Sequence, residues 1–259
     1  MELFYLNRPL NFAHRGASGE SPENTLAAFW LAAELGADGI ELDVHLSKDG
    51  EVVVIHDFSL ERTTNGHGLV RDRTLAELKQ LDAGSWFDPS FVGQGIPTLQ
   101  EVIDLLGHRL RLNIEVKPAG LLDNELVSAV VRTVEENQIL DRAIISSFNP
   151  LALWRVKQLN PRVSVGLLHA PDQPLPLRRA WLHRLIRLDA VHPHHTMANE
   201  VYMRWARRNG YRVHPWTCDD PGEMERLIGE GVDLIITNRP GLLRQVLLAD
   251  RKGRSTPAL

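Results

Sequence analysis

Residues 40–57 read IELDVHLSKDGEVVVIHD, two β-strand patterns separated by a turn. In the first pattern, apolar residues alternate with Glu41 and Asp43. Successive side chains of a strand point to opposite faces, so the two carboxylates share one face, about 7 Å apart along the backbone. The opposite face is apolar. The pattern predicts a strand that packs on one side and presents acids on the other.

Further strand patterns follow at intervals along the chain. Together with the first they make eight, at residues 10–14, 38–44, 111–116, 142–147, 163–168, 188–192, 211–216 and 233–237. Amphipathic helix patterns separate them, which predicts parallel strands joined by crossover helices. The fold class that we expect is therefore α/β, a closed (β/α)8 TIM barrel. An open doubly wound sheet is the alternative, but the HRGAS turn after the first strand lacks the glycine-rich phosphate fingerprint.

The connection after the second strand is much longer than an ordinary loop. It runs for about 50 residues, and loops beyond about 15 residues are uncommon. It contains the turn-rich RTTNGHG and a short helix pattern, TLAELKQL. We interpret residues 57–97 as an insertion on the barrel rim, within one domain of residues 1–259. Residues 250–259 are predicted to be a frayed tail.

The composition excludes several functional classes. The 259 residues have a net charge of −4, so nothing suggests a nucleic-acid partner. One cysteine, Cys218, cannot form an internal disulfide. No apolar run approaches the roughly 18 residues that span a bilayer, and the N-terminus has no signal-peptide pattern. We expect a cytoplasmic protein without stable membrane insertion; no sequence feature indicates an oligomeric state.

Acidic residues on two strands predict a metal site. Asn113, Glu115 and Lys117 share one face of the third strand, so Glu115 can join Glu41 and Asp43 where barrel active sites form. Unpaired buried anions are costly, and an all-oxygen ligand set suits one hard divalent cation, Mg²⁺ or Ca²⁺. The alternative is that Glu41 pairs with a nearby arginine or lysine as a structural ion pair.

Histidines and cations at strand ends complete the predicted site. His14 and His56 end their strands beside the acids and could act as an acid/base pair. Arg15 and Lys117 are cations that could hold a phosphate. A zinc cluster of His192, His194 and His195 is the weaker interpretation, because such neighbouring histidines more often line a pocket or face solvent.

A set of short motifs resembles the glycerophosphodiester phosphodiesterase family. In order along the chain they are HRG (14–16), PENT (22–25), GAD (36–38), ELDV (41–44), KDG (48–50), HD (56–57), RTTNG (62–66), LDAG (81–84), IPTL (96–99), NIEVK (113–117), SF (147–148), WT (216–217) and TNRP (237–240). The resemblance covers nearly the whole chain and keeps the order of the motifs.

The resemblance implies the same barrel, with a small insertion after the second strand. It implies Glu41, Asp43 and Glu115 as metal ligands. His14 and His56 would be the acid and the base, and the resemblance does not indicate which histidine is the acid. Arg15 and Lys117 would contact phosphate, Trp216 would wall the substrate pocket, and the insertion would shape the glycerol pocket. The expected substrate is a small glycerophosphodiester, cleaved to glycerol 3-phosphate and an alcohol by water or through a cyclic phosphate.

Two positions depart from the family pattern. Asp219 stands where the family often has Asn, and Asn238 where it often has Asp. An added negative charge at Asp219 would weaken phosphate binding unless the side chain points away.

Alternative functions are a lysophospholipase D on the same barrel, a zinc amidohydrolase, and a phosphodiester-binding or structural protein without catalysis. The amidohydrolase would need His-x-His after the first strand, and the chain has His-Arg.

Overall fold

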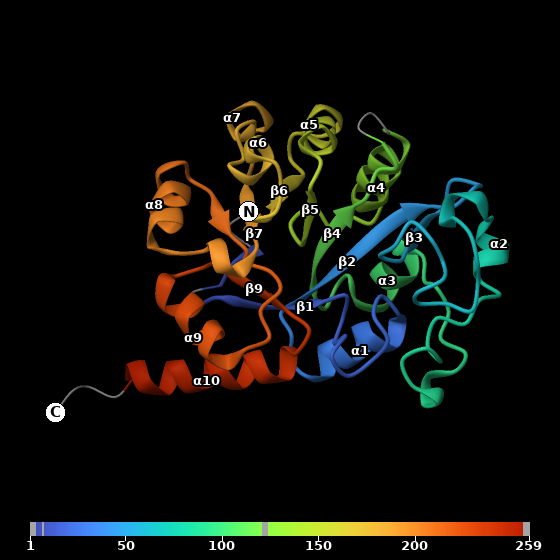
Figure 1. Ribbon diagram of the computed structural model, residues 1–259, viewed down its shortest axis with the longest axis horizontal. Helices are drawn as coiled ribbons and strands as arrows, with labels where there is room; N and C mark the ends of the chain where they lie inside the picture. The colour runs from blue at the N-terminus through green and yellow to red at the C-terminus, as the bar shows by residue number, and fades with distance from the viewer. Residues whose placement is uncertain (1–3, 7, 121–123, 256–259) are drawn as a thin grey trace.

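The computed structural model describes residues 4–6, 8–120 and 124–255, in which strands and helices alternate (Figure 1). The strands are β1 (Leu10–His14), β2 (Gly39–Leu46), β3 (Val52–Val54), β4 (Arg111–Val116), β5 (Ala143–Ser147), β6 (Ser164–His169), β7 (Ala190–Pro193), β8 (Arg212–Val213) and β9 (Leu234–Thr237). The helices are α1 (Leu26–Glu34), α2 (Leu75–Leu78), α3 (Leu99–Leu106), α4 (Glu125–Glu136), α5 (Pro150–Leu159), α6 (Leu175–Arg178), α7 (His183–Ile186), α8 (Glu200–Arg208), α9 (Pro221–Glu230) and α10 (Pro240–Ser255). Short 3-10 turns are η2 (Val70–Asp72), η3 (Pro89–Phe91) and η4 (His195–Met197).

The parallel strands form a barrel inside a ring of helices (Figure 1). Their order is β8-β7-β6-β5-β4-β2-β1-β9, each paired in parallel with its neighbour. Backbone hydrogen bonds from Asp233 to Val213 and from Ile236 to Pro215, both 3.0 Å, bring β9 against β8 and close the ring. The predicted (β/α)8 TIM barrel is confirmed.

The alternation in β2 sorts its side chains as the sequence predicts. Ile40, Leu42 and Val44 are fully buried in the core between strands and helices. Glu41 and Asp43 point to the barrel interior, whose lower part holds a separate apolar cluster that includes Phe12 and Ile236. The acids therefore lie above an apolar floor at the C-terminal ends of the strands.

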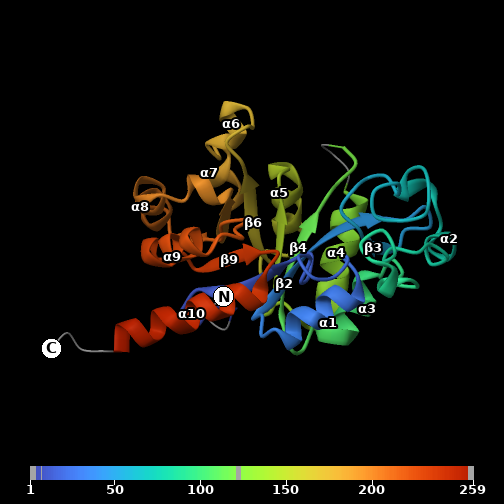
Figure 2. The ribbon, with the colours of Figure 1, turned by 60° about the horizontal axis from the view of Figure 1, so that its bottom comes forward.

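Local capping positions several helices. Thr98 and Glu101 form a capping box at α3, with the Thr98 side chain accepting from the Glu101 N–H. Asp220 caps α9, which ends at Gly231 in the left-handed region. α10 packs against α9 and β1 (Figure 2).

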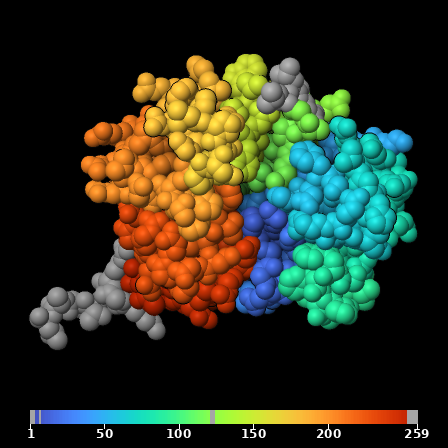
Figure 3. Space-filling model, viewed as in Figure 1, coloured from blue at the N-terminus to red at the C-terminus, as the bar shows by residue number. Residues whose placement is uncertain are grey.

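The segment after β2 forms a small unit on the rim. β3 pairs antiparallel with β2, and η2, α2 and η3 follow before α3 begins. Its own apolar cluster includes Leu60, Val70 and Leu78. In the space-filling view this segment, cyan to green, lies beside the barrel (Figure 3). The short β3 and its neighbours therefore carry His56 to the barrel mouth.

Some element bounds differ from expectation. β8 ends at Val213 although the pattern extended to residue 216, because Pro215 cannot donate a ladder hydrogen bond. α10 continues to Ser255, past residue 250, where a frayed tail was expected to begin; Leu243 and Val246 anchor the helix through their buried side chains. Residues 256–259 lie outside the described residues. Within the described ranges, no helix combines the length and apolar character that a membrane span requires.

Candidate active site

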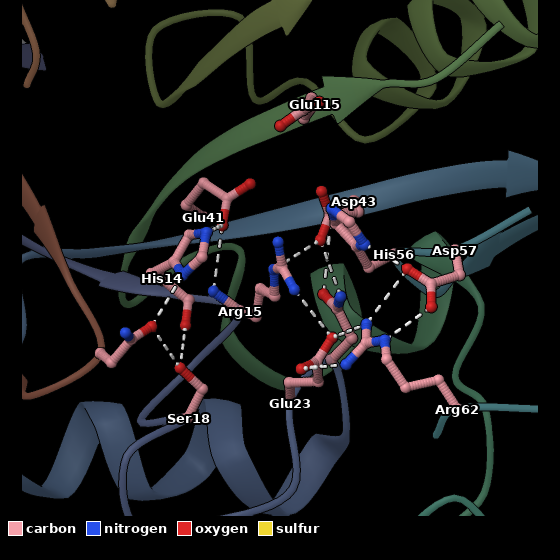
Figure 4. Close-up of polar contacts among 12 residues, drawn as sticks. His14, Arg15, Ser18, Glu23, Glu41, Asp43, His56, Asp57, Arg62 and Glu115 are labelled. Atoms are coloured by element: carbon pink, nitrogen blue, oxygen red, sulfur yellow. Dashed lines mark hydrogen bonds and ion pairs between the residues drawn. The ribbon is translucent and has the colours of Figure 1, made fainter. Parts of the chain in front are cut away.

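The three predicted acids gather at the mouth of the barrel. Asp43 lies opposite Glu115 in the β2–β4 register, and Glu41 lies opposite Asn113. Glu41 is 3% exposed, Asp43 1% and Glu115 9%. One carboxylate oxygen from each residue lies within 4.8 Å of the others, and they converge in Figure 4. The strand register therefore creates a buried acidic triad.

The electrostatics of the triad fit a hard divalent cation. Burial raises the pKa of Glu41 well above its usual range, and the charges of Asp43 and Glu115 add to the effect. Burial likewise raises the pKa of Glu115, although Lys117 opposes it. Three oxygens at this separation can share one ion with metal–oxygen bonds of about 2.0–2.6 Å. A cation among them would remove the repulsion that these raised pKa values report.

Two cations already offset part of this charge. Lys117 Nζ lies 3.2 Å from Asp43 Oδ1 and 2.9 Å from Glu115 Oε1. Arg15 Nε lies 3.2 Å from Asp43 Oδ2. Burial alone would raise the pKa of Asp43, but these two cations outweigh burial and hold it well below its usual range. Asp43 and Glu115 are thus ion-paired, whereas among the described residues no arginine or lysine side chain forms an ion pair with Glu41.

Arg15 occupies a strained turn that follows β1. Its φ is 54°, in the left-handed region that costs a non-glycine residue free energy. In this conformation its backbone N–H donates to Glu41 Oε2 at 3.0 Å, while its guanidinium contacts Glu23 and Asp43. The turn therefore lets one residue bind two members of the triad (Figure 4).

The two predicted histidines flank the acids, each bound through Nδ1. His14 Nδ1 lies 2.7 Å from Asn238 Oδ1, and its Nε2 lies 3.8 Å from Glu41 Oε2. Burial, with a further contribution from Arg15, lowers the pKa of His14 to about 4. His56 Nδ1 lies 2.5 Å from Asp57 Oδ1, and burial lowers the pKa of His56 as well. Burial therefore favours the neutral form of both rings.

Residues without a predicted role support His56 and Asp43. The Arg62 guanidinium binds Asp57 Oδ2 at 2.6 Å and both oxygens of Glu23 (Figure 4). Its hydrogen bond lowers the pKa of Asp57 to about 2. Asn24 Nδ2 donates to Asp43 Oδ2 at 2.8 Å. The sequence signal for Asp57 is its place directly after His56, and Asn24 and Arg62 belong to the PENT and RTTNG motifs, but only the fold shows which residues they contact.

The site residues line one small pocket. Its volume is about 60 Å³, and its polar lining includes His14, Arg15, His56 and the triad members Glu41 and Glu115. Phe148 and Trp216 form an aromatic wall, with ring centroids 5.5 Å apart and planes at 88°. Trp216 is held by a hydrogen bond from Nε1 to the His192 carbonyl at 2.8 Å.

His192 in β7 and His194 and His195 directly after it do not form a zinc cluster in the described structure. His192 is fully buried and hydrogen bonded to His214, whereas His195 pairs with Glu223. Among the described residues, the side chains close enough together to hold a metal ion are those of Glu41, Asp43 and Glu115, not the histidines.

A larger groove adjoins the pocket. It has a volume of about 500 Å³ and shares Lys117 with the pocket. Phe58 and Leu69 from the insertion and Leu126 from α4 supply apolar lining, and Lys48 and Arg71 supply positive charge. The insertion therefore forms one side of an amphiphilic groove beside the candidate active site.

Comparisons with known proteins agree with this architecture. Residues 14–242 match the Glycerophosphoryl diester phosphodiesterase family. A glycerophosphodiester phosphodiesterase of Caldanaerobacter subterraneus subsp. tengcongensis is 44% identical over 95% of this chain and 99% of its own length. One of Bacillus subtilis is 36% identical over 93% of this chain and 87% of its own length.

A solved structure has the same fold. It is an Oleispira antarctica phosphodiesterase in complex with the product sn-glycerol-3-phosphate, with a TM-score of 0.84 and 34% identity over 92% of this chain and 96% of that chain. From the matched family, the curated relatives and the shared barrel, we conclude that this chain belongs to the glycerophosphoryl diester phosphodiesterase family.

Proposed function

We propose that the protein hydrolyses a glycerophosphodiester to glycerol 3-phosphate and an alcohol, with one divalent cation in the acidic triad. The observation that carries the proposal is the convergence of Glu41, Asp43 and Glu115 within 4.8 Å in a pocket that His14 and His56 also line. The relative that binds sn-glycerol-3-phosphate supports the same product class.

Glu41, Asp43 and Glu115 would hold the cation, and oxygen ligands favour Mg²⁺ or Ca²⁺ over Zn²⁺. When bound, such a cation supplies positive charge to the phosphoryl oxygens and to the attacking hydroxyl. Arg15 and Lys117 lie beside this position and would add charge-assisted contacts to the same phosphate. Phe148 and Trp216 would pack against the substrate carbons.

His14 and His56 would carry the protons. One histidine, in its neutral form, takes a proton onto Nε2 from the attacking water, and the other, in its imidazolium form, delivers its Nε2 proton to the departing alkoxide, so that diester and water become glycerol 3-phosphate and a neutral alcohol. Proton exchange with solvent then returns both rings to their starting forms. Because Nδ1 of each ring is already bonded, Nε2 is the nitrogen available for this transfer.

The test is release of glycerol 3-phosphate from glycerophosphocholine, with and without a chelator and with Mg²⁺ or Ca²⁺ restored. We expect activity to vanish with the chelator and to return with one of the cations. Glu41→Ala should lose both activity and binding of the cation, measured by calorimetry, whereas Glu51→Ala, an exposed acid on the same hairpin, should retain both. A metal-free Glu41→Ala protein with full activity would contradict the proposal.

Lysophospholipase D activity on the same site is the second candidate. It is favoured by the groove beside Lys117, where Phe58 is 49% exposed and Leu69 37% exposed. An acyl chain could cover these side chains. Comparing kcat/KM for glycerophosphocholine and its acylated form separates the two functions, and a higher value for the acylated form would establish the second.

A further inference from the structure

The two departures from the family pattern contact each other behind the pocket. Asp219 follows β8, and Asn238 follows β9, its neighbour at the barrel closure. Asp219 Oδ2 accepts a hydrogen bond from Asn238 Nδ2 at 2.6 Å. Asp219 Oδ1 accepts from the Asn238 backbone N–H and from the Thr237 hydroxyl, both at 2.8 Å. The Asp219 carboxylate is thus engaged by the end of β9.

This contact orients the Asn238 amide. A carboxylate only accepts hydrogen bonds, so the NH₂ group of Asn238 must face Asp219. The Oδ1 atom of Asn238 then faces the other way, where it lies 2.7 Å from His14 Nδ1 and accepts from Ser18 Oγ at 2.8 Å. Without the negative charge of Asp219, either end of the amide could turn toward His14.

The oriented amide selects one tautomer of His14. An amide oxygen cannot donate, so the hydrogen in the 2.7 Å contact belongs to His14 Nδ1. A neutral ring with Nδ1 protonated carries its lone pair on Nε2, the nitrogen that lies toward Glu41 at 3.8 Å. His14 lines the catalytic pocket, so this tautomer presents a proton acceptor next to the triad.

We propose that Asp219 is a positioning residue that acts through Asn238 to hold His14 in the Nδ1–H tautomer. The proposal rests on the function proposed above, in which His14 transfers a proton. Asp219 and Asn238, from two neighbouring strand ends, form a relay of carboxylate and amide to the His14 imidazole, and neither of the two is among the residues that line the pocket. The two positions that depart from the family pattern therefore act as one unit, in which the Asp219 carboxylate fixes the orientation of the Asn238 amide.

The decisive experiment exchanges the two groups. D219N removes the carboxylate and allows the Asn238 amide to turn, which places an NH₂ group against His14 Nδ1 and forces the hydrogen onto Nε2. We expect kcat to fall about 10- to 100-fold, the range typical of lost supporting hydrogen bonds, with KM changed less than about threefold. N238D alone sets two carboxylates against each other and should also lower kcat. The double variant D219N/N238D places the carboxylate beside His14 and the amide behind it, which should restore most of kcat.

Nitrogen chemical shifts of labelled histidine read the tautomer directly. The His14 signals are identified by their loss in H14Q, and they should report Nδ1–H in the wild type and in the double variant, but not in D219N. D220N is the matched control: Asp220 is the adjacent, exposed acid that caps α9, and Asn caps equally well. It should leave kcat, KM and the shifts unchanged.

Failure of the two proposals can be told apart. Wild-type turnover by H14Q would contradict the role of His14 in hydrolysis, whereas the shifts still test the relay. A wild-type tautomer and kcat in folded D219N, or a double variant no more active than either single variant, would overturn the positioning role of Asp219. Circular dichroism and Tm verify that each variant is folded.

Discussion

The Lys117 ammonium group lies 3.2 Å from Asp43 Oδ1, although the two residues belong to segments more than seventy positions apart. The same group lies 2.9 Å from Glu115, so one lysine bridges two members of the acidic triad. Asp43 is 1% exposed, and its charge is therefore compensated by neighbours rather than by water. Under the function proposed above, Lys117 and a divalent cation would together neutralise the charge of the triad, and this has measurable consequences.

Lys117→Met should destabilise the protein most when no divalent cation is present. Removing one partner of a buried ion pair costs about 3–5 kcal/mol, because the remaining charges stay buried. We expect the free energy of unfolding in a chelator to fall by about that amount, and Mg²⁺ or Ca²⁺ to raise Tm more in the variant than in the wild type. Denaturant unfolding with and without cation measures both effects.

Arg204→Met provides the control for this change. Arg204 forms an exposed pair with Glu200, 3.7 Å apart, and such pairs contribute about 0–1 kcal/mol. If Lys117→Met destabilised no more than Arg204→Met, the bridging role of Lys117 would be refuted.

Asp57→Asn should lower kcat through His56. Asp57 accepts from His56 Nδ1 at 2.5 Å, and an amide in its place could donate to Nδ1 and select the wrong tautomer. We expect a loss of about 10- to 100-fold in kcat with little change in KM, measured by release of glycerol 3-phosphate. Arg62→Gln, which removes a 43% exposed partner of Asp57, should cost less. Equal losses in the two variants would indicate that the ion pair, rather than the His56 contact, is what matters.

Acid should unfold the protein through buried, neutral histidines. Burial lowers the pKa of His169 to about 4 and that of His192 to about 3, and it lowers the pKa of His214 well below 6.5. Because the unfolded chain binds protons near pH 6.5 and the folded chain does not, stability is fully present above pH 6.5. It is lost as pH falls toward the folded values, by up to about 1.4 kcal/mol per pH unit for each histidine.

Urea unfolding between pH 7.5 and 4.5 measures this loss. His169→Gln should reduce the slope of stability against pH by about one histidine's share, whereas His67→Gln, at an exposed position, should leave it unchanged. An identical slope in wild type and His169→Gln would show that acid acts elsewhere.

Gly166→Ala should be destabilising because β6 passes close to a buried ring. A Cβ at this position would lie 2.2 Å from His192 Nε2, and His192 is fully buried. Overpacking of this kind costs about 1–3 kcal/mol. Gly229→Ala is the matched change in α9, where nothing lies within 4 Å, and it should stabilise by about 0.5–1 kcal/mol. Thermal unfolding of the pair should show shifts of opposite sign; a neutral Gly166→Ala would mean that His192 can move aside.

Local sequence patterns were sufficient to predict the barrel fold and the three residues of the acidic triad. Alternation in IELDV assigns Glu41 and Asp43 to one face, and NIEVK does the same for Glu115 and Lys117, because the strand period is two wherever the strand lies. The strand–helix rhythm then predicts a parallel barrel, and parallel strands bring their C-terminal ends to one mouth. The alternation of apolar and polar residues did not predict where β8 ends, because Pro215 lacks the backbone N–H that a further ladder hydrogen bond would need.

Partners that meet across the barrel depended on the three-dimensional fold. The relay from Asp219 through Asn238 to His14 joins residues more than two hundred positions apart, and no local period encodes such a contact. The same holds for Arg62 beside Glu23, which requires the insertion to fold back over the β1 turn. The direction of the hydrogen bond at His14, and with it the tautomer of that ring, is set by these distant neighbours, because a ring nitrogen donates or accepts according to the atom that it faces.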